Sequence, residues 1–396
     1  MRVISTIRLD HALAIAIAIA VLVRLVAFAA AMAWPIPNEN GEPVSPLLAP
    51  SYHDFRFYLR SLARYTTSWT AILDEFWDFY RSPFDQPAVS FLISGPAFPL
   101  LMRATGFDTG NYLPLNLIYL GFGTLTAILW LFWLRAQGLG GLWLALFAAL
   151  PNPIWHTLVV STDMLFATEF VVFFLAYFAK SSGRTRVLIW TVAFLLMLIT
   201  RPNAFSVLAF VAGDAMWTFV RDRRLPPLRG AAVLFLWVFG TLYFYPYFLN
   251  EMTKAGNTLR YFGYTPFEYF AGIYESLPRA LDLVASWIAL IGAKALYIVG
   301  LRPSYGVTST PFVLLRAAAG IVLLPGLIML FVWAPGRIRL LVALYILPVV
   351  LGPTQDRYYL PLYPIWFLYG AMFWNRAFEA GRRAVRGYTG SAAGPS

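Results

Sequence analysis

A carboxylate stands near the start of the least hydrophobic stretch of the chain, residues 49–86, where Asp54 lies between His53 and Arg56. A carboxylate in an exposed segment can accept a proton from a hydroxyl group as that oxygen attacks an electrophile. We therefore take Asp54 as the candidate catalytic base, with Asp74, Glu75, Asp78 and Asp85 as rivals. The alternative is that these acids are solvated charges on a surface helix.

Two arginines follow or precede apolar runs and could hold an anion. Arg201 ends the run in LITRPNAF, and Arg357 precedes another in QDRYYLPLYP. A guanidinium at a membrane boundary is costly unless it meets an anion, and its planar fork suits a phosphate group. Both are predicted to bind a ligand phosphate, with Arg56 next. The alternatives are snorkelling to the interface and a salt bridge, for example to Asp163 or Asp356.

Further polar residues are weaker candidates for substrate binding: Asp85, His156, Asp163, Tyr358, Lys254 and Arg260. Asp163, Ser161 or Thr162 could instead cap the following helix. His156 and Asp54 could share a divalent cation, but three histidines in the chain give weak support for a metal site. We predict that no metal and no other cofactor is required.

Two further acids, Glu169 and Asp214, fall inside apolar runs. Acids within a membrane are functional candidates by default, although pairing with Arg201 or Arg24 would serve packing equally well.

The composition indicates what must position these residues. Hydrophobic residues make up 60% of the 396 and charged residues only 12%, whereas soluble domains carry roughly 25% charged residues. The chain is therefore predicted to be a membrane protein. It has no cysteine, which excludes disulfides and thiolate chemistry. The net charge of +11 is better explained by cytoplasmic loops than by nucleic acid, and no soluble nucleotide-binding motif is present.

The apolar runs predict an all-α polytopic membrane protein with about ten transmembrane helices. The predicted spans are 11–33, 112–135, 140–157, 163–180, 185–201, 204–220, 230–249, 312–333, 338–352 and 358–376. Two more apolar stretches, 87–103 and 281–301, are read as helices on the outer surface. They belong to two outer loops, 34–111 and 250–311, of which the first carries amphipathic helices. Residues 1–376 then form one transmembrane catalytic domain, followed by a cytoplasmic tail, 377–396, whose last ten residues we expect to be disordered.

The charges set the orientation. With both termini in the cytoplasm, that side holds most of the basic residues and only three acids, Asp10, Asp222 and Glu379. Such asymmetry is typical of cytoplasmic loops. The excess of Arg over Lys favours a bacterial inner membrane. The first apolar run could be a cleaved signal peptide, but its length favours an anchor that remains as the first helix.

The layout resembles the integral-membrane glycosyltransferases of the GT-C superfamily. The similar strings are DFRFY at Asp54, the Pro-rich QPAVSFLISGPAFPLLMRATGF, STDMLF followed by ITRPN, and RYYLPLYPIWFL, within residues 10–375. The His-Pro-Pro that is frequent in the family is missing.

The resemblance implies an inverting transferase that moves a sugar from a polyprenyl-phosphate donor to an acceptor hydroxyl at the outer face. Asp54 would deprotonate the acceptor, which is a lipid, glycan or protein, and Arg201, Arg357 and Arg56 would hold the donor phosphate. The lipid phosphate is a good leaving group once its charge is neutralised, so no general acid is needed. The alternatives are a flippase or transporter of lipid-linked glycans, a polymerase or ligase of such glycans, and a non-catalytic scaffold.

Overall fold

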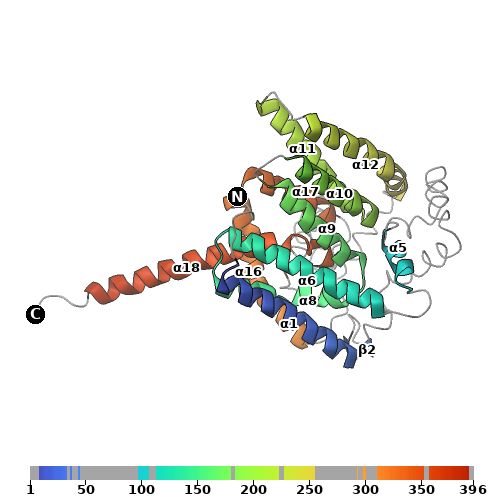
Figure 1. Cartoon of the computed structure of the whole chain (residues 1–396). Helices are drawn as coiled ribbons and strands as arrows, with labels where there is room; N and C mark the ends of the chain where they lie inside the picture. The colour runs from blue at the N-terminus through green and yellow to red at the C-terminus, as the bar shows by residue number, and fades with distance from the viewer. Residues whose placement is uncertain are drawn as a thin grey trace, which may run out of the picture.

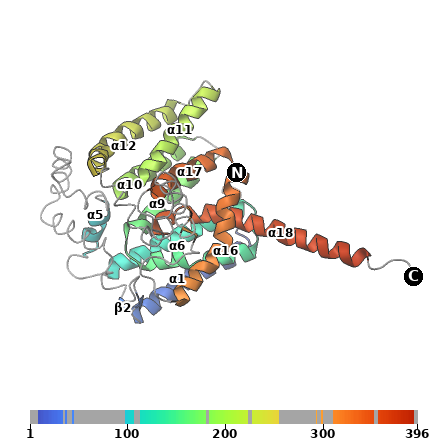
Figure 2. The same cartoon turned by 180° about the vertical axis from the view of Figure 1, so that it is seen from behind.

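The fold is a bundle of apolar helices (Figures 1 and 2). The computed structural model describes residues 9–33, 36–37, 43–44, 97–106, 113–179, 183–222, 227–254, 292, 298–299, 310–351 and 356–391. Three helices in this part are long and apolar enough to cross a membrane: α1 (His11–Ala33), α6 (Leu113–Ala136) and α11 (Ala204–Asp222). Many of their large apolar side chains are exposed. Apolar side chains on the outside of a helix bundle are stable when lipid surrounds them. These helices therefore indicate a helical membrane protein.

The described residues form further helices. They are α5 (Ala97–Ala104), α7 (Gly141–Ala148), α8 (Pro151–Leu158), α9 (Thr162–Tyr177), α10 (Arg184–Thr200), α12 (Pro227–Lys254), α16 (Thr310–Trp333), α17 (Gly336–Leu351), the short 3₁₀ helix η4 (Asp356–Tyr359) and α18 (Tyr363–Ser391). The strands described are β1 (Ile36–Pro37) and β2 (Pro43–Val44), which pair antiparallel just after α1. Both lie in the first predicted outer loop.

Contacts between helices show in which direction each helix runs through the bundle. Asp10, which precedes α1, pairs with Arg135 in the last turn of α6, so α1 and α6 run antiparallel. We call the end at which α1 begins the near end and the opposite one the far end. Near the start of α6, the Tyr119 hydroxyl donates to the Ser161 carbonyl, 2.6 Å away, just before α9. The beginning of α9 is therefore at the far end, and its last residue, Tyr177, is at the near end.

Asp10 both caps α1 and pairs with a cation, and this makes its contribution to stability sensitive to acid. Its carboxylate accepts from the Leu13 amide at 2.8 Å and from Arg135 Nε at 2.8 Å. The Leu13 amide, followed by Arg135, holds the pKa of Asp10 below its ordinary value of 3.8. A carboxyl group whose pKa is lowered on folding stabilises the fold above its ordinary pKa, and that stabilisation is lost as the pH falls through the lowered value.

We therefore expect Asp10→Asn to lower the melting temperature by a few degrees at pH 7, and by progressively less as the pH falls below 3.8. Asparagine still caps the helix, so the difference reports the charged interactions. The measurement is thermal unfolding in detergent across this pH range. A difference that did not shrink on acidification would contradict the assignment.

One predicted span is two helices. Residues 140–157 were predicted to form a single span, but α7 ends at Ala148 and α8 begins at Pro151. The structure corrects the prediction because Pro151 has no N–H to continue the α7 hydrogen-bond ladder and instead occupies the first position of a new helix. The buried guanidinium of Arg24 in α1 donates to the Ala148 carbonyl at the break, 3.3 Å away, and to Ala20 at 3.1 Å.

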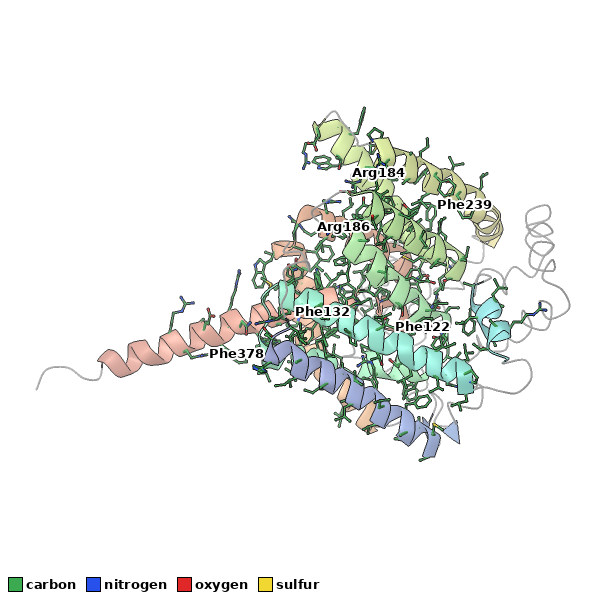
Figure 3. The ribbon with its side chains drawn as sticks, in the orientation of Figure 1. Phe122, Phe132, Arg184, Arg186, Phe239 and Phe378 are labelled. Carbon is green, nitrogen blue, oxygen red and sulfur yellow. The ribbon has the colours of Figure 1, made fainter. Side chains whose placement is uncertain are left out.

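α16 and α18 touch backbone to backbone. A Cβ atom on Gly326 would collide with the Trp366 carbonyl, and one on Gly370 with the Val322 carbonyl. Small residues at such a crossing allow the close approach of helices that associate in a membrane. Beyond this crossing α18 leaves the bundle at the near end (Figure 1), and Phe378 lies on this outer part (Figure 3). The disorder predicted for the last ten residues is wrong for 387–391, which continue the helix to Ser391.

We expect Gly370→Ala to destabilise the protein by about 1–3 kcal/mol, because the added methyl group overpacks against a carbonyl that cannot move alone. Gly381→Ala is the matched control, since the same α18 helix has open space there and alanine favours a helix by up to about 1 kcal/mol. Thermal unfolding of both variants in one detergent makes the comparison. Equal stability of the two would show that the crossing is looser than described.

Candidate functional site

The strongest candidate site is a buried group of charges at the far end, made by residues from three segments. Asp163 lies in the first turn of α9, Arg201 is the residue that ends α10, and Arg357 lies in η4. Asp163 Oδ1 pairs with Arg201 Nη1, and Arg357 Nη1 is 3.7 Å from Asp163 Oδ2. The exposed fractions of the side chains are 1% for Asp163, 7% for Arg201 and 10% for Arg357. We call Asp163, Arg201, Arg357 and Tyr358 the arginine cluster.

Tyr358 orients both guanidinium groups. The Cζ atoms of Arg201 and Arg357 lie 4.8 Å and 5.5 Å from the centre of its ring, within the range of a cation–π contact. The backbone at Tyr358 is itself fixed, because the Tyr345 hydroxyl of α17 donates to its carbonyl at 3.0 Å. The aromatic ring thus contacts both cations that pair with Asp163.

The local sequence explains how α9 and α10 deliver these groups. Ser161 caps α9, with its side-chain oxygen accepting from the Asp163 amide at 3.3 Å, which confirms the predicted cap. The next helix, α10, stops at Arg201 because Pro202 disfavours a helical residue before it, and the Arg201 backbone is extended. Since α9 begins where α10 ends, the Arg201 guanidinium at the end of α10 faces the first turn of α9.

The cluster has the charge of an anion site. Two guanidinium groups and one carboxylate meet in a place with little water, where a buried charge needs an opposite charge close by. The N-terminus of α9 adds a partial positive charge. Such a site is suited to an anion, and a planar guanidinium is suited to phosphate oxygens.

Glu169 lies about two turns further along α9 and supports the end of α10. It is buried, and its Oε1 accepts from the Thr200 hydroxyl at 2.9 Å. Thr200 immediately precedes Arg201, so this bond anchors the backbone from which the arginine extends. The pairing of Glu169 with Arg201 or Arg24 that the sequence allowed is not what the structure has.

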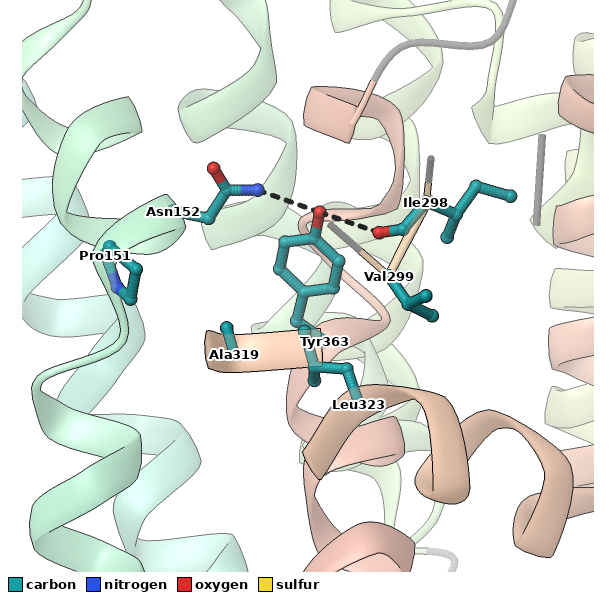
Figure 4. A pocket seen from close by; sticks show the side chains of 7 residues that line it. All are labelled: Pro151, Asn152, Ile298, Val299, Ala319, Leu323 and Tyr363. Atoms are coloured by element: carbon teal, nitrogen blue, oxygen red, sulfur yellow. Dashed lines mark hydrogen bonds between the residues drawn. The ribbon is translucent and has the colours of Figure 1, made fainter. Parts of the chain in front are cut away.

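A small pocket lies beside the break between α7 and α8 (Figure 4). It is lined by Pro151, Asn152, Ile298, Val299, Ala319, Leu323 and Tyr363. The Asn152 amide donates to the Tyr363 hydroxyl at 2.8 Å, which is 3.4 Å from the Ile298 carbonyl. Most of the lining is apolar. Because Tyr363 begins α18 shortly after Arg357, the pocket adjoins the segment that carries the arginine cluster.

A second charged group joins four helices at the near end. Asp214 of α11 accepts from Arg337 of α17 at 2.6 Å through each of two nitrogens, from Arg229 of α12 at 2.7 Å, and from Tyr177 of α9 at 2.7 Å. Its carboxylate accepts four hydrogen bonds from these partners, one at Oδ1 and three at Oδ2. Pairing with Arg201 or Arg24 was the alternative that the sequence allowed, and the partners observed are different. We assign this group a structural role.

The structure thus brings together four of the predicted residues: Asp163, Arg201, Arg357 and Tyr358. The alternative salt bridge from Arg357 to Asp163 is confirmed, so these arginines are not only snorkelling cations. His156 is buried on α8, and Lys254 is the last residue of α12. Asp54, Arg56, Asp85 and Arg260 lie outside the described residues.

Sequence reasoning missed Tyr345, which fixes Tyr358, and Asn152, which borders the pocket. Asn152 had a usable signal, because it is four residues before His156 and two polar residues at that spacing share one face of an otherwise apolar helix. Tyr345 had none, since an aromatic residue in an apolar run is typical of any buried helix. Within the described ranges no three His, Asp or Glu side chains are grouped so that they could hold a metal ion.

No protein-family model, no curated protein and no solved structure matches this chain.

Proposed function

We propose that the protein is an inverting glycosyltransferase of the GT-C type, which moves a sugar from a polyprenyl-phosphate donor to an acceptor hydroxyl. The observation that carries the proposal is the convergence of Arg201 and Arg357, which lie far apart in the sequence, on one buried site at the far end of the bundle. A lipid-linked donor requires cations at the depth of the headgroups, next to an apolar region for its tail. The described apolar helices and the arginine cluster support this assignment.

In the proposed reaction the two guanidinium groups neutralise the donor phosphate. Asp54 accepts the proton of the acceptor hydroxyl as that oxygen attacks the anomeric carbon. The new bond joins this carbon to the acceptor oxygen, and the bond that breaks joins it to the phosphate oxygen. The electron pair leaves with the lipid phosphate, whose charge the arginines stabilise. Arg56, Lys254 and Arg260 remain candidates for the donor and acceptor contacts, and the acceptor class stays open between lipid, glycan and protein.

The membrane arrangement belongs to the same proposal. About ten crossings would place both termini in the cytoplasm, with the near end of the bundle inside and the far end outside. The basic residues at the near end, Arg135, Arg221, Arg229, Arg337 and Arg339 among them, support this orientation. The cluster would then face the periplasmic or extracellular side of a bacterial inner membrane.

A second candidate, a flippase for lipid-linked glycans, is favoured by the break between α7 and α8. Broken helices are common where transporters bind their substrates, and the buried Arg24 beside the break is a cation inside the bundle. A flippase would bind the same lipid phosphate without cleaving it. Transfer of the sugar therefore separates the two functions.

The test of the proposed site is Arg357→Gln. We expect this variant to bind a radiolabelled polyprenyl-phosphate sugar about 10- to 100-fold more weakly than the parent, because a hydrogen bond to a charged group contributes about 1.5–3 kcal/mol. Arg357 is preferred to Arg201, whose loss would also leave Asp163 without its nearest cation. Filter binding in detergent measures the donor affinity.

Arg339→Gln is the control, since it removes a guanidinium from the near end, where the side chain is exposed. It should bind the donor as the parent does. Equal affinities of parent and Arg357→Gln would remove the cluster as the phosphate site. Binding by the parent without any transfer to membrane acceptors would favour the flippase.

A further inference from the structure

The two arginines that hold helices together at the near end have hydrogen-bond donors left over. Arg337 reaches the Asp214 carboxylate through Nε and Nη2, at 2.6 Å each. Arg229 uses Nη2 alone, for Asp214 at 2.7 Å and for the Tyr177 hydroxyl at 3.0 Å. Because a guanidinium has five N–H donors, these bonds to described residues leave N–H groups of both arginines available for a further acceptor.

Both cations face outward, and both are held in place. The exposed fractions of the side chains are 44% for Arg337 and 21% for Arg229, against 1% for Asp214. The Cζ atom of Arg337 lies 5.3 Å from the centre of the Phe178 ring, and that of Arg229 lies 5.2 Å from the centre of the Tyr177 ring, in the range of cation–π contacts. The two guanidinium groups would therefore lose little freedom on binding a ligand.

The position of the pair along the helices is that of lipid headgroups. Arg229 is the third residue of α12 and Arg337 the second of α17, beside the end of α11, which is long and apolar enough to cross a membrane. Exposed apolar side chains adjoin both cations: Leu228 precedes Arg229, and Leu340 follows Arg337 by one turn. An anionic head could contact the arginines while its chains lie along the helices.

We propose that Arg229 and Arg337 bind the phosphodiester headgroup of an anionic phospholipid, which then joins α12 to α17 at the near end. Basic sites between membrane helices bind such headgroups, and the planar guanidinium matches phosphate oxygens. A lipid is favoured over a free inorganic anion because Leu228 and Leu340 continue the site along an apolar surface. The site is at the opposite end of the bundle from the arginine cluster, so the inference does not depend on the proposed function.

Asp214 gives the proposal a signature that loss of stability alone would not produce. Its carboxylate holds both arginines and thereby competes with a lipid phosphate for them. Removing a cation should therefore weaken lipid binding, whereas removing the carboxylate should strengthen it. Both kinds of substitution break the same ion pairs, so a purely structural role would give both the same sign.

The experiment measures lipid binding to the full-length protein in detergent by native mass spectrometry. The probes are dioctanoyl phosphatidylglycerol, which is anionic, and dioctanoyl phosphatidylcholine, which is zwitterionic. We expect the parent to prefer phosphatidylglycerol by at least about fivefold, and Arg337→Gln and Arg229→Gln each to weaken its binding by about fivefold. Binding of phosphatidylcholine should not change. A parent that binds the two lipids equally well would overturn the proposal.

Arg339→Gln is the matched control. It removes the same charge from the same end of α17, but Arg339 donates to the Phe331 carbonyl of α16 instead of to Asp214. Its affinity for phosphatidylglycerol should be that of the parent. An equal loss in Arg339→Gln and Arg337→Gln would mean that the lipid is attracted to the basic end as a whole, and the assigned site would be wrong.

Asp214→Asn should bind phosphatidylglycerol more tightly than the parent, and the lipid should restore part of the melting temperature that the substitution lowers. Unchanged or weaker binding in this variant contradicts the proposal. Inorganic phosphate at the same concentration should not restore stability, and equal restoration by both would make the site one for a free anion. Should Asp214→Asn or Arg337→Gln not fold, the comparison of Arg229→Gln with Arg339→Gln decides.

Discussion

Replacing Asp54 by asparagine should reduce sugar transfer by about 10²- to 10⁴-fold, the usual contribution of a general base, while donor binding stays unchanged. Asparagine keeps the size and polarity of the side chain but cannot accept the acceptor's proton. The arginine cluster is retained in this variant, so the donor phosphate keeps its partners. Single-turnover transfer from a radiolabelled polyprenyl-phosphate sugar, with donor affinity measured in parallel, gives both quantities.

The control for this prediction is Asp85→Asn. Asp85 is a carboxylate of the same predicted outer loop, and its replacement should change the rate by less than about fivefold if Asp54 is the base. A large loss in Asp85→Asn with normal transfer in Asp54→Asn would exchange the two assignments. Loss of donor binding in Asp54→Asn would instead mean that Asp54 contacts the donor or holds the loop.

Apolar length predicted several helices closely, because a helix that spans hydrocarbon must be continuous and long. The span predicted at 11–33 is α1, and those at 112–135 and 204–220 differ from α6 and α11 by a residue or two at the ends. In each case an apolar run is bounded by a charge or by a helix-capping residue. The number of crossings stays a prediction.

The errors arose where proline, rather than hydrophobicity, controls the backbone. Residues 140–157 are apolar enough for one helix, but Pro151 divides them. In the same way the span predicted at 358–376 begins only at Tyr363, after the 3₁₀ turn of η4 and Pro361. An average of hydropathy over a long window does not register one missing N–H group.

The arginine cluster could be predicted in part. Each arginine stands alone beside an apolar run, which marks it as a costly residue that needs an anion, and alternating spans place Arg201 and Arg357 at the same end of the bundle. The sequence could not show that both contact Asp163, since three segments far apart in the chain must pack for that to happen. It also could not distinguish Asp163 as a cap from Asp163 as a counter-charge; in the structure Ser161 caps α9, and the Asp163 carboxylate is the counter-charge.

The near-end group shows the cost of a buried carboxylate that has only a structural role. We expect Asp214→Asn to destabilise the protein by about 3 kcal/mol, the lower end of the range for breaking a buried ion pair. The lower end applies because the Arg337 and Arg229 side chains are 44% and 21% exposed, so water can solvate them once the charge is lost. Thermal unfolding in detergent measures the change.

Two comparisons test the physical cause. Asp222→Asn removes an exposed partner of Arg221 on the same helix, and the loss of stability should be much smaller than in Asp214→Asn, because surface pairs contribute little. Adding Arg337→Gln to Asp214→Asn removes one of the two stranded cations, so the double variant should be more stable than the sum of the single effects predicts. Additive effects would mean that shape, and not charge, holds α9, α11, α12 and α17 together. The fraction of Asp214→Asn that stays folded should transfer sugar at the rate of the parent. The charges proposed to bind the donor are at the other end of the bundle.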